Sequence, residues 1–341
     1  MAVIFESAAF QQNSQVTATH VLLIGCSEYP SLAAAGYSAL KPLTSPRVSV
    51  EAMANWFLGG ADAMPLGQAR PPEEAFYNPE APLGSLVMLA SPSHAYQSPA
   101  GFDSPCTRPT VANIRDAYAQ WIDRLGANPG SRGVFHFCGH GVSNGISQFL
   151  VADDFGADPN DLWSAVFHVS NTCQATIRKT SATLFFLIDA CMELSEDLIN
   201  EIEEPRALIG GKRSGPPKTT EWSVLRATTT NRLAYAPEKG VARFTAAILQ
   251  ALQGHCGTQR TAEPTFSVGI SELREAAAAF LALSQQVEGG ARQKLGQTEG
   301  EGDWSVGLHV QTKRPSVLVE MDIEPQGYRP VARAFMEDLA Q

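Results

Sequence analysis

Residues 133–141, GVFHFCGHG, and residues 183–191, TLFFLIDAC, decide how this chain folds. Each segment contains an uninterrupted apolar run of strand length, which is typical of a strand buried on both faces of a parallel sheet. Each run leads into side chains that can do chemistry, His140 in the first segment and Cys191 in the second. The two segments predict central strands with reactive residues at their carboxyl ends, where ligands bind in sheets of this class.

Further runs of strand length occur on both sides of these two segments. They are residues 20–25, 85–90, 222–228 and 304–310. Between the runs, apolar residues recur three and four positions apart, as in helices that pack on a sheet, at residues 48–58, 111–125, 159–179, 241–252 and 271–283. This alternation predicts an α/β fold with a mostly parallel, six-stranded sheet. The four strongest of the six runs are apolar on both faces and should be its central strands.

Composition narrows the class of protein. The chain has 341 residues, 44% of them hydrophobic and 18% charged, which suffices for a large core and excludes disorder. Its 25 Lys and Arg against 35 Asp and Glu give a formal net charge of −10, and without a basic block a nucleic-acid partner is not expected. No apolar run approaches the roughly 20 residues of a membrane span.

The N-terminus and the cysteines bear on the cellular compartment. The first residues, MAVIFESAAFQQNSQ, lack the basic region of a secretory signal, so we expect a cytoplasmic protein with no membrane partner. Six cysteines without CxxC spacing predict mostly buried thiols instead of a disulfide framework or a zinc site. Two stretches break the regular alternation, residues 60–83 with five prolines and residues 195–221 with many charges, glycines and prolines, and both predict long surface loops.

A cysteine and a histidine that meet at one sheet edge can act as a thiol nucleophile and its base. The thiolate is the attacking form, and a free thiol with a pKa near 8.5 is mostly protonated at pH 7. His140 can take the proton of Cys191 and later give it to a leaving amine. The amide groups of Gly141 and Cys191 are candidates to bind an oxyanion. The group that orients His140 stays open at this point, as a backbone carbonyl, an acid or an amide.

These residues resemble the caspase-like peptidases. The shared features are Gly-His-Gly after a buried strand, a cysteine 51 residues later, and an acid two residues before that cysteine, as in the D-x-C motif of metacaspases and their bacterial relatives. Residues 21–30, 52–57 and 222–252 resemble the first strand, the first helix, and the fifth strand with its following helix. The resemblance covers residues 18–311 and implies a three-layer α/β/α caspase-like sandwich. Residues 1–17 would then be an N-terminal arm, residues 195–221 a flexible linker-like loop, and residues 312–341 a C-terminal extension.

The resemblance implies a cysteine endopeptidase in which Cys191 is the nucleophile, His140 the general base and acid, and Gly141 an oxyanion donor. Asp189 matches the acid that lines the S1 pocket of metacaspases and favours Arg or Lys at P1. Ser49 falls where these enzymes carry a second acid. Glu28 is either a replacement for that acid or a solvated loop residue. Trp222 opens the fifth strand, along whose edge an extended protein substrate is expected to bind.

Two forms of control follow from the resemblance. Metacaspases often need calcium, although the chemistry itself requires no cofactor, and Asp153 and Asp154 are the candidate ligands here. Acids at a helix N-terminus account for this pair equally well. In the family the segment after the nucleophile is often cut during maturation, so we expect cleavage after Lys212 or Arg213, by the enzyme itself or by an upstream protease. A surface insertion without a regulatory role is the alternative.

Two other functions stay open. A catalytically silent caspase-like scaffold or interaction module would keep the fold without hydrolysis, and intact His140 and Cys191 count against it. A separase-like or CHAT-type protease would use the same chemistry but require a dedicated activator. The partners expected are therefore a protein substrate and an activating protease or regulatory protein, in a bacterial signalling or defence cascade.

Overall fold

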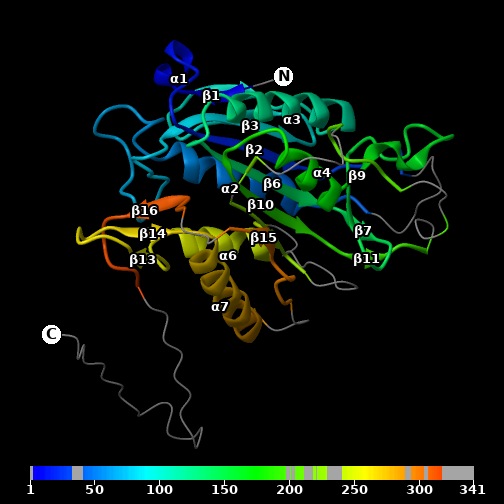
Figure 1. Ribbon diagram of the computed structural model, residues 1–341. Helices are drawn as coiled ribbons and strands as arrows, with labels where there is room; N and C mark the ends of the chain where they lie inside the picture. The colour runs from blue at the N-terminus through cyan, green and yellow to red at the C-terminus, as the bar shows by residue number, and fades with distance from the viewer. Residues whose placement is uncertain are drawn as a thin grey trace, which may run out of the picture.

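A seven-stranded sheet forms the centre of the molecule (Figure 1). The computed structural model describes residues 3–32, 41–196, 200, 204–210, 218–219, 221–228, 240–288, 293–302 and 306–316. The five inner strands of the sheet are parallel, in the order β3 (Leu83–Ala90), β2 (Thr19–Gly25), β6 (Arg132–Gly139), β10 (Thr183–Ala190) and β12 (Trp222–Arg226). Two short antiparallel strands close the edges, β1 (Val3–Glu6) beside β3 and β15 (Glu299–Glu301) beside β12.

The strand predictions are confirmed for five of the six runs, and these five runs form the five inner strands. The predicted number of six is wrong, because both edge strands were missed and the described part of the run at residues 304–310 does not join this sheet. The part of that run within the described residues belongs to β16 (His309–Gln311), which pairs with the hairpin of β13 (Thr258–Gln259) and β14 (Phe266–Val268). The sequence of β15 is EGE, which has no apolar residue by which a pattern could mark it.

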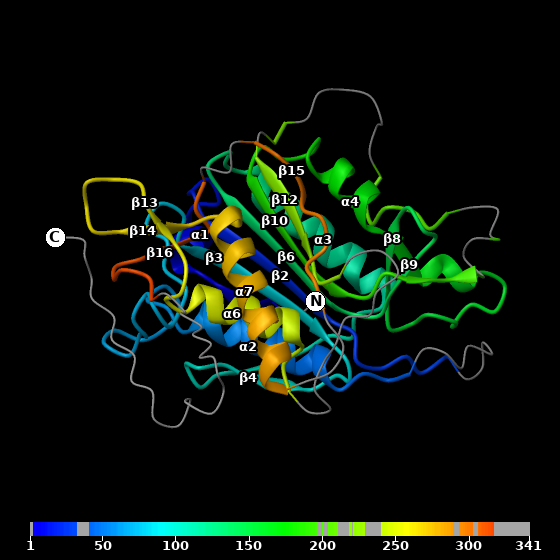
Figure 2. The same ribbon diagram turned by 90° about the horizontal axis from the view of Figure 1, so that it is seen from below.

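Helices cover both faces of the sheet and make it the middle of three layers (Figure 2). One face carries α2 (Ser45–Leu58), α6 (Arg243–Leu252) and α7 (Ile270–Glu288). The other carries α3 (Val111–Gly126) and α4 (Val169–Thr176). The predicted three-layer α/β/α fold is therefore confirmed.

Alternation along the strands builds two separate cores. On β2, Val21 and Leu23 point to the core under α2 and α6, whereas Leu22 and Ile24 point to the core under α3. All four side chains are fully buried. Neighbouring strands repeat this pattern, which is why the predicted runs carry apolar residues on both faces.

Four of the five predicted helices form, and the fifth is wrong in part. Within residues 159–179 the chain makes a short 3-10 helix (Leu162–Ala165) and the strand β9 (Val166–His168) before α4 begins. The strand forms because β9 pairs with β8 (Gln148–Val151), in a small sheet that also contains β7 (Gly141–Ser143) and β11 (Glu193–Leu194). This small sheet continues from the ends of β6 and β10, so it lies beside the expected active site.

The remaining segments lie at the periphery. Residues of the expected N-terminal arm supply β1 and the helix α1 (Ala8–Gln12), and β4 (Ala95–Gln97) pairs with β5 (Asp103–Pro105) in a small hairpin. As predicted, residues 60–82 contain no helix or strand. The start of the C-terminal extension is anchored on this loop, because Glu73 accepts hydrogen bonds from the amides of Thr312 and Lys313. In the part of the chain that the structure describes, no helix is both long and apolar enough to cross a bilayer.

Truncating Leu187 to alanine should lower the free energy of unfolding by about 2–5 kcal/mol, because this β10 side chain is completely buried under α6 and a cavity would remain. The same truncation at the fully exposed Leu66 should change it by less than about 0.5 kcal/mol. Urea unfolding followed by circular dichroism measures both changes. Equal unfolding midpoints for the two variants would contradict the two-core arrangement.

Candidate functional site

His140 and Cys191 leave neighbouring strands at the same level of the sheet. β10 pairs with β6 in a single register from Thr183–Arg132 to Ala190–Gly139, and every pair is 51 residues apart. Beyond the strand ends, β11 pairs with β7 at the same separation. His140 and Cys191 are also 51 residues apart, so they lie opposite each other between these two ladders, on chains about 4.8 Å apart. The structure thus brings the predicted pair together.

The pair also belongs to one face of the sheet. Alternate residues of β6 and β10 turn toward α6, where His136 and Asp189 both contact Thr245. His140 and Cys191 are the next alternate residues after Cys138 and Asp189, so they belong to the same face. Burial raises the pKa of the Cys138 thiol, and the electrostatic effect of the nearby Cys191 adds to that rise. Cys191 is partly exposed, whereas the other five cysteines are buried. It is therefore the most accessible thiol of the chain.

A backbone carbonyl orients the ring of His140. The carbonyl oxygen of Lys41 lies 2.7 Å from Nε2. Because a carbonyl only accepts hydrogen bonds, Nε2 carries the proton of the neutral imidazole and Nδ1 carries the lone pair. Of the three kinds of group that the sequence left open for this role, the structure selects the backbone carbonyl.

Tyr29 contacts both the backbone and the ring of His140. The sequence analysis did not predict this contact. Its hydroxyl accepts a hydrogen bond from the backbone amide of His140 at 2.9 Å and donates one to the carbonyl of Cys26 at 3.2 Å. The two rings lie side by side with their centroids 4.9 Å apart. Burial raises the pKa of Tyr29 well above its usual value, so the hydroxyl keeps its proton. Tyr29 lies within residues 21–30, which the sequence analysis noted only for their resemblance to the first strand of the family.

Gly141 packs directly on the peptide of Cys191. A Cβ at this position would collide with the carbonyl oxygen of Cys191 and press on the side chain of Ala190. Only glycine lets the backbone of β7 come this close. The predicted oxyanion donor therefore lies next to Cys191.

Asp189 and Ser49 lie on either side of Cys138, in the layer between the sheet and the starts of α2 and α6. Asp189 Oδ2 accepts hydrogen bonds from the amide and hydroxyl of Thr245, at 3.1 and 2.6 Å. The Ser49 hydroxyl accepts a hydrogen bond from the amide of Ala242 at 2.9 Å. The Cys138 thiol is hydrogen-bonded to the side chains of both Ser49 and Asp189. Both predicted pocket residues are buried, Asp189 with 3% of its surface exposed. Burial raises the pKa of Asp189 to about 6, and the hydrogen bonds from Thr245 limit that rise.

Two neighbours of this group are core residues, as expected. His136 is fully buried and its Nε2 lies 3.0 Å from the Thr245 hydroxyl. Burial lowers the pKa of His136 to about 3, so it stays neutral. Cys138 is also buried, and burial raises the pKa of its thiol.

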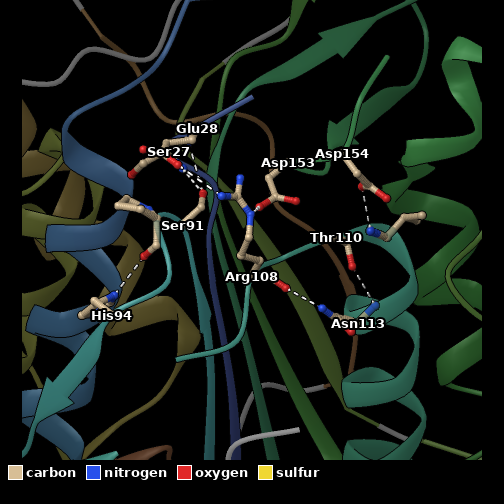
Figure 3. A network of polar contacts seen from close by, with 11 residues as sticks. Ser27, Glu28, Ser91, His94, Arg108, Thr110, Asn113, Asp153 and Asp154 are labelled. Atoms are coloured by element: carbon tan, nitrogen blue, oxygen red, sulfur yellow. Dashed lines mark hydrogen bonds and ion pairs between the residues drawn. The ribbon is translucent and has the colours of Figure 1, made fainter. Parts of the chain in front are cut away.

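The predicted calcium ligands already have other partners (Figure 3). Arg108 lies between Asp153, 2.9 Å from its Nε, and Glu28, 3.3 Å from its Nη1. Asp154 accepts a hydrogen bond from the amide of Val111 in the first turn of α3. Burial raises the pKa of Asp153 to about 6, and the Arg108 guanidinium opposes that rise.

Calcium binding by Asp153 and Asp154 stays a prediction. Among the described residues, no group of three or more acidic, histidine or cysteine side chains could hold a metal. The alternative of an acid at a helix N-terminus accounts for Asp154, although the helix is α3 and not the one expected after residue 159. Glu28 pairs with Arg108, and its role as a pocket acid stays a prediction.

The edge of β12 is covered by the chain itself, which corrects the expected mode of substrate binding. β15 pairs with Trp222–Val224, and the amide of Gly296 donates to the carbonyl of Arg226 at 2.9 Å. Trp222 is only 6% exposed. A substrate strand can add along this edge only beyond Arg226 or after residues 293–301 move away. The predicted cleavage sites Lys212 and Arg213 lie outside the described residues.

Known proteins are similar to this chain in sequence or in fold. The family model of the caspase domain matches residues 18–268. The chain is 58% identical over 289 residues to the uncharacterized protein y4kE of Sinorhizobium fredii, which covers 85% of this chain and 83% of y4kE. The fold is similar to that of protein GSU0716 from Geobacter sulfurreducens, with a TM-score of 0.51 and 13% identity over 89% of this chain and all of that one. Caspase-1 from Spodoptera frugiperda gives a TM-score of 0.47 and 12% identity over 88% and 91% of the two chains.

The burial of Asp189 predicts a pH dependence of stability that Asp189→Asn should remove. An unfolded aspartate titrates near pH 3.9, so between about pH 4 and 6 the folded wild type keeps a proton that the unfolded chain has lost. The wild type should therefore lose stability as the pH rises through this window, by up to roughly 3 kcal/mol. The asparagine still accepts from Thr245 but does not titrate, so the stability of the variant relative to wild type should rise from pH 4 to 6.

Urea denaturation at intervals from pH 4 to 8 measures this difference. Asp116→Asn, the same change at an exposed position of α3, serves as the control and should follow the wild type across the range. A constant difference between Asp189→Asn and wild type would show that Asp189 titrates alike in the folded and unfolded chains.

Proposed function

We propose that this chain, which belongs to the caspase domain family, is a cysteine endopeptidase that cleaves protein substrates with Cys191 and His140. The observation that carries the proposal is the continuous 51-residue register, which sets the thiol and the imidazole opposite each other at the carboxyl ends of β10 and β6. The carbonyl of Lys41 and the hydroxyl of Tyr29 then fix the ring and backbone of His140. This is the pair of groups, with an orienting partner, that nucleophilic catalysis by cysteine requires.

The arrangement gives each group a place in the reaction. His140 Nδ1 takes the thiol proton, and the Cys191 thiolate attacks the carbonyl carbon of the scissile bond. The carbonyl oxygen becomes an oxyanion, for which the amides of Gly141 and Cys191 are the nearby donors. His140 returns its proton to the nitrogen of the leaving amine as the C–N bond breaks. Water, activated by the same imidazole, then splits the thioester and releases Cys191.

The Lys41 carbonyl supports His140 in both protonation states. It accepts a hydrogen bond from the Nε2–H group of the neutral ring. When Nδ1 is also protonated, the ring carries a positive charge and the same hydrogen bond is stronger. The bond therefore holds the ring in one orientation while its charge changes. Tyr29 contributes no charge, because its hydroxyl stays protonated.

We also propose that Asp189 selects Arg or Lys at P1. Both hydrogen bonds from Thr245 go to Oδ2, which leaves Oδ1 with acceptor capacity. The side chain is on the same face of the sheet as Cys191 and two residues before it, so a long basic P1 side chain would extend along that face toward the carboxylate. Ser49 adds no charge to this position, and the pocket relies on Asp189 alone.

The covered edge of β12 favours an enzyme that needs an activating event. Residues 293–301 occupy the edge that an extended substrate would use. A regulatory protein that displaces this segment, or cleavage after Lys212 or Arg213, would be such an event. A scaffold without activity would not need the support that His140 receives from Lys41 and Tyr29.

Cys191→Ala and His140→Ala should each abolish peptide hydrolysis. Both variants should stay folded, with unfolding midpoints like those of other conservative substitutions in this chain. Because the two residues act as a unit, the double variant should be little worse than either single one. Cys256→Ala and His255→Ala, which alter a thiol and an imidazole far along the chain from the pair, are the controls and should keep their activity. More than a few per cent of wild-type activity in Cys191→Ala would exclude Cys191 as the nucleophile.

Asp189→Asn should weaken hydrolysis after Arg and Lys, because a charged hydrogen bond worth about 1.5–3 kcal/mol is replaced by a neutral one. This corresponds to a loss of roughly 10- to 100-fold in kcat/KM for basic P1 residues, with little change for neutral ones. A P1 peptide library compares the two enzymes, and Asp116→Asn is the control. An unchanged P1 preference would show that Asp189 only holds the first turn of α6.

A further inference from the structure

Gln148 lies at the start of β8 and contacts the backbone of the nucleophile. Its Nε2 donates hydrogen bonds to the carbonyl oxygens of Ala190, at 3.3 Å, and Cys191, at 3.1 Å. The side chain is buried, with 2% of its surface exposed. These two contacts join the small sheet after His140 to the peptide groups on both sides of Cys191.

Arg226 fixes the orientation of the Gln148 amide. The guanidinium Nε of Arg226 donates to Gln148 Oε1 at 3.0 Å, and its Nη2 pairs with Glu299 at 3.1 Å. A guanidinium only donates and a carbonyl only accepts, so one orientation of the amide satisfies both neighbours. Arg226 is itself 5% exposed, which leaves the pair little freedom to rearrange.

The two bonds from Gln148 determine where the neighbouring amide groups point. In a planar trans peptide, the carbonyl of one residue and the N–H of the next point in opposite directions. Because the carbonyls of Ala190 and Cys191 both turn toward Gln148, the N–H groups of Cys191 and Met192 both turn away from it. The direction of the Cys191 N–H, which the proposed mechanism uses as an oxyanion donor, therefore depends on the bond from Gln148 to the Ala190 carbonyl.

We infer that Gln148 is a positioning residue for oxyanion binding, which acts by orienting the N–H group of Cys191, one of the two donors in the proposed mechanism. The inference rests on the proposed function, because an oxyanion forms only if Cys191 attacks a carbonyl carbon. Gln148 contacts neither the thiol nor the imidazole in the described structure. Its loss should therefore slow acyl transfer while the intrinsic reactivity of the thiol stays the same.

Two substitutions test this role, with one matched control. Gln148→Met removes both polar ends at similar volume, and Gln148→Glu keeps an acceptor for Arg226 but replaces the donor to the carbonyls by an oxygen that repels them. Gln174→Glu, the same change at an exposed position of α4 beside Arg178, is the control. If Gln148→Met fails to fold, Gln148→Glu still carries the test, because it retains the bond to Arg226.

Three measurements separate positioning from general support of the fold. Hydrolysis of the best wild-type library peptide should lose about 100-fold in kcat, with KM within about two-fold. A peptide aldehyde, whose carbon bonds to Cys191 Sγ while its oxygen takes up the charge, should bind more weakly by a similar factor. Alkylation of Cys191 by iodoacetamide, which forms no oxyanion, should keep its rate and its pH profile.

The outcomes are distinct. Equal losses in alkylation and hydrolysis would mean that Gln148 only supports the local fold, and unchanged hydrolysis would mean that it has no role. Either result overturns the inference and leaves the proposed function intact. Two negative results with the wild type would overturn the proposed function, and this inference with it. The wild type would have to hydrolyse no peptide of the library, both before and after a cleavage that displaces residues 293–301 from β12, and it would have to leave the aldehyde unbound.

Discussion

The parallel pairing of β6 with β10 is the constraint on which the rest of the site depends. Every hydrogen-bonded pair between these strands joins residues 51 positions apart, and the same separation relates the loops that follow. A slip of one residue would turn Cys191 to the other face of the sheet, away from His140. The slip is prevented far from the site, because it would also exchange the residues of β10 that fill the two apolar cores. The packing of the middle of the sheet thereby fixes the geometry of its end.

Much of the fold could be predicted because it follows from apolar patterning. The inner strands carry apolar residues on both faces, and α2, α3, α6 and α7 each carry an apolar stripe, so their existence and type were readable from the sequence. The edge strands were not readable, since β15 is EGE and gains its structure only by pairing with β12. Likewise β9 lay within a helical pattern, and its pairing with β8 overrode the local preference.

The candidate site divides in the same way. His140, Cys191 and Gly141 follow strongly patterned strands, and their placement follows from the strand ends. The supporting groups do not, because the Lys41 carbonyl, the Tyr29 hydroxyl and the Gln148 amide reach the site from distant segments. A backbone carbonyl has no sequence signature at all. The adjacent acids Asp153 and Asp154 predict a calcium site, which stays a prediction, and the contact of Asp153 with the Arg108 side chain has no signature in the sequence.

Several buried polar groups lie near the carboxyl end of the sheet. Gln148, Asp153, Asp189 and Arg226 all expose 5% or less of their surface, and each lies at or beyond the end of a strand. Burying such groups stabilises a fold only weakly, and apolar side chains of the same size would often serve stability as well. What these groups supply is fixed direction: each bond sets the orientation of one neighbour, from Arg226 through Gln148 to the peptide of Cys191. The chain therefore places its stability in the two cores and its directional bonds around the nucleophile, where a displacement of one ångström matters far more to a reaction than to folding.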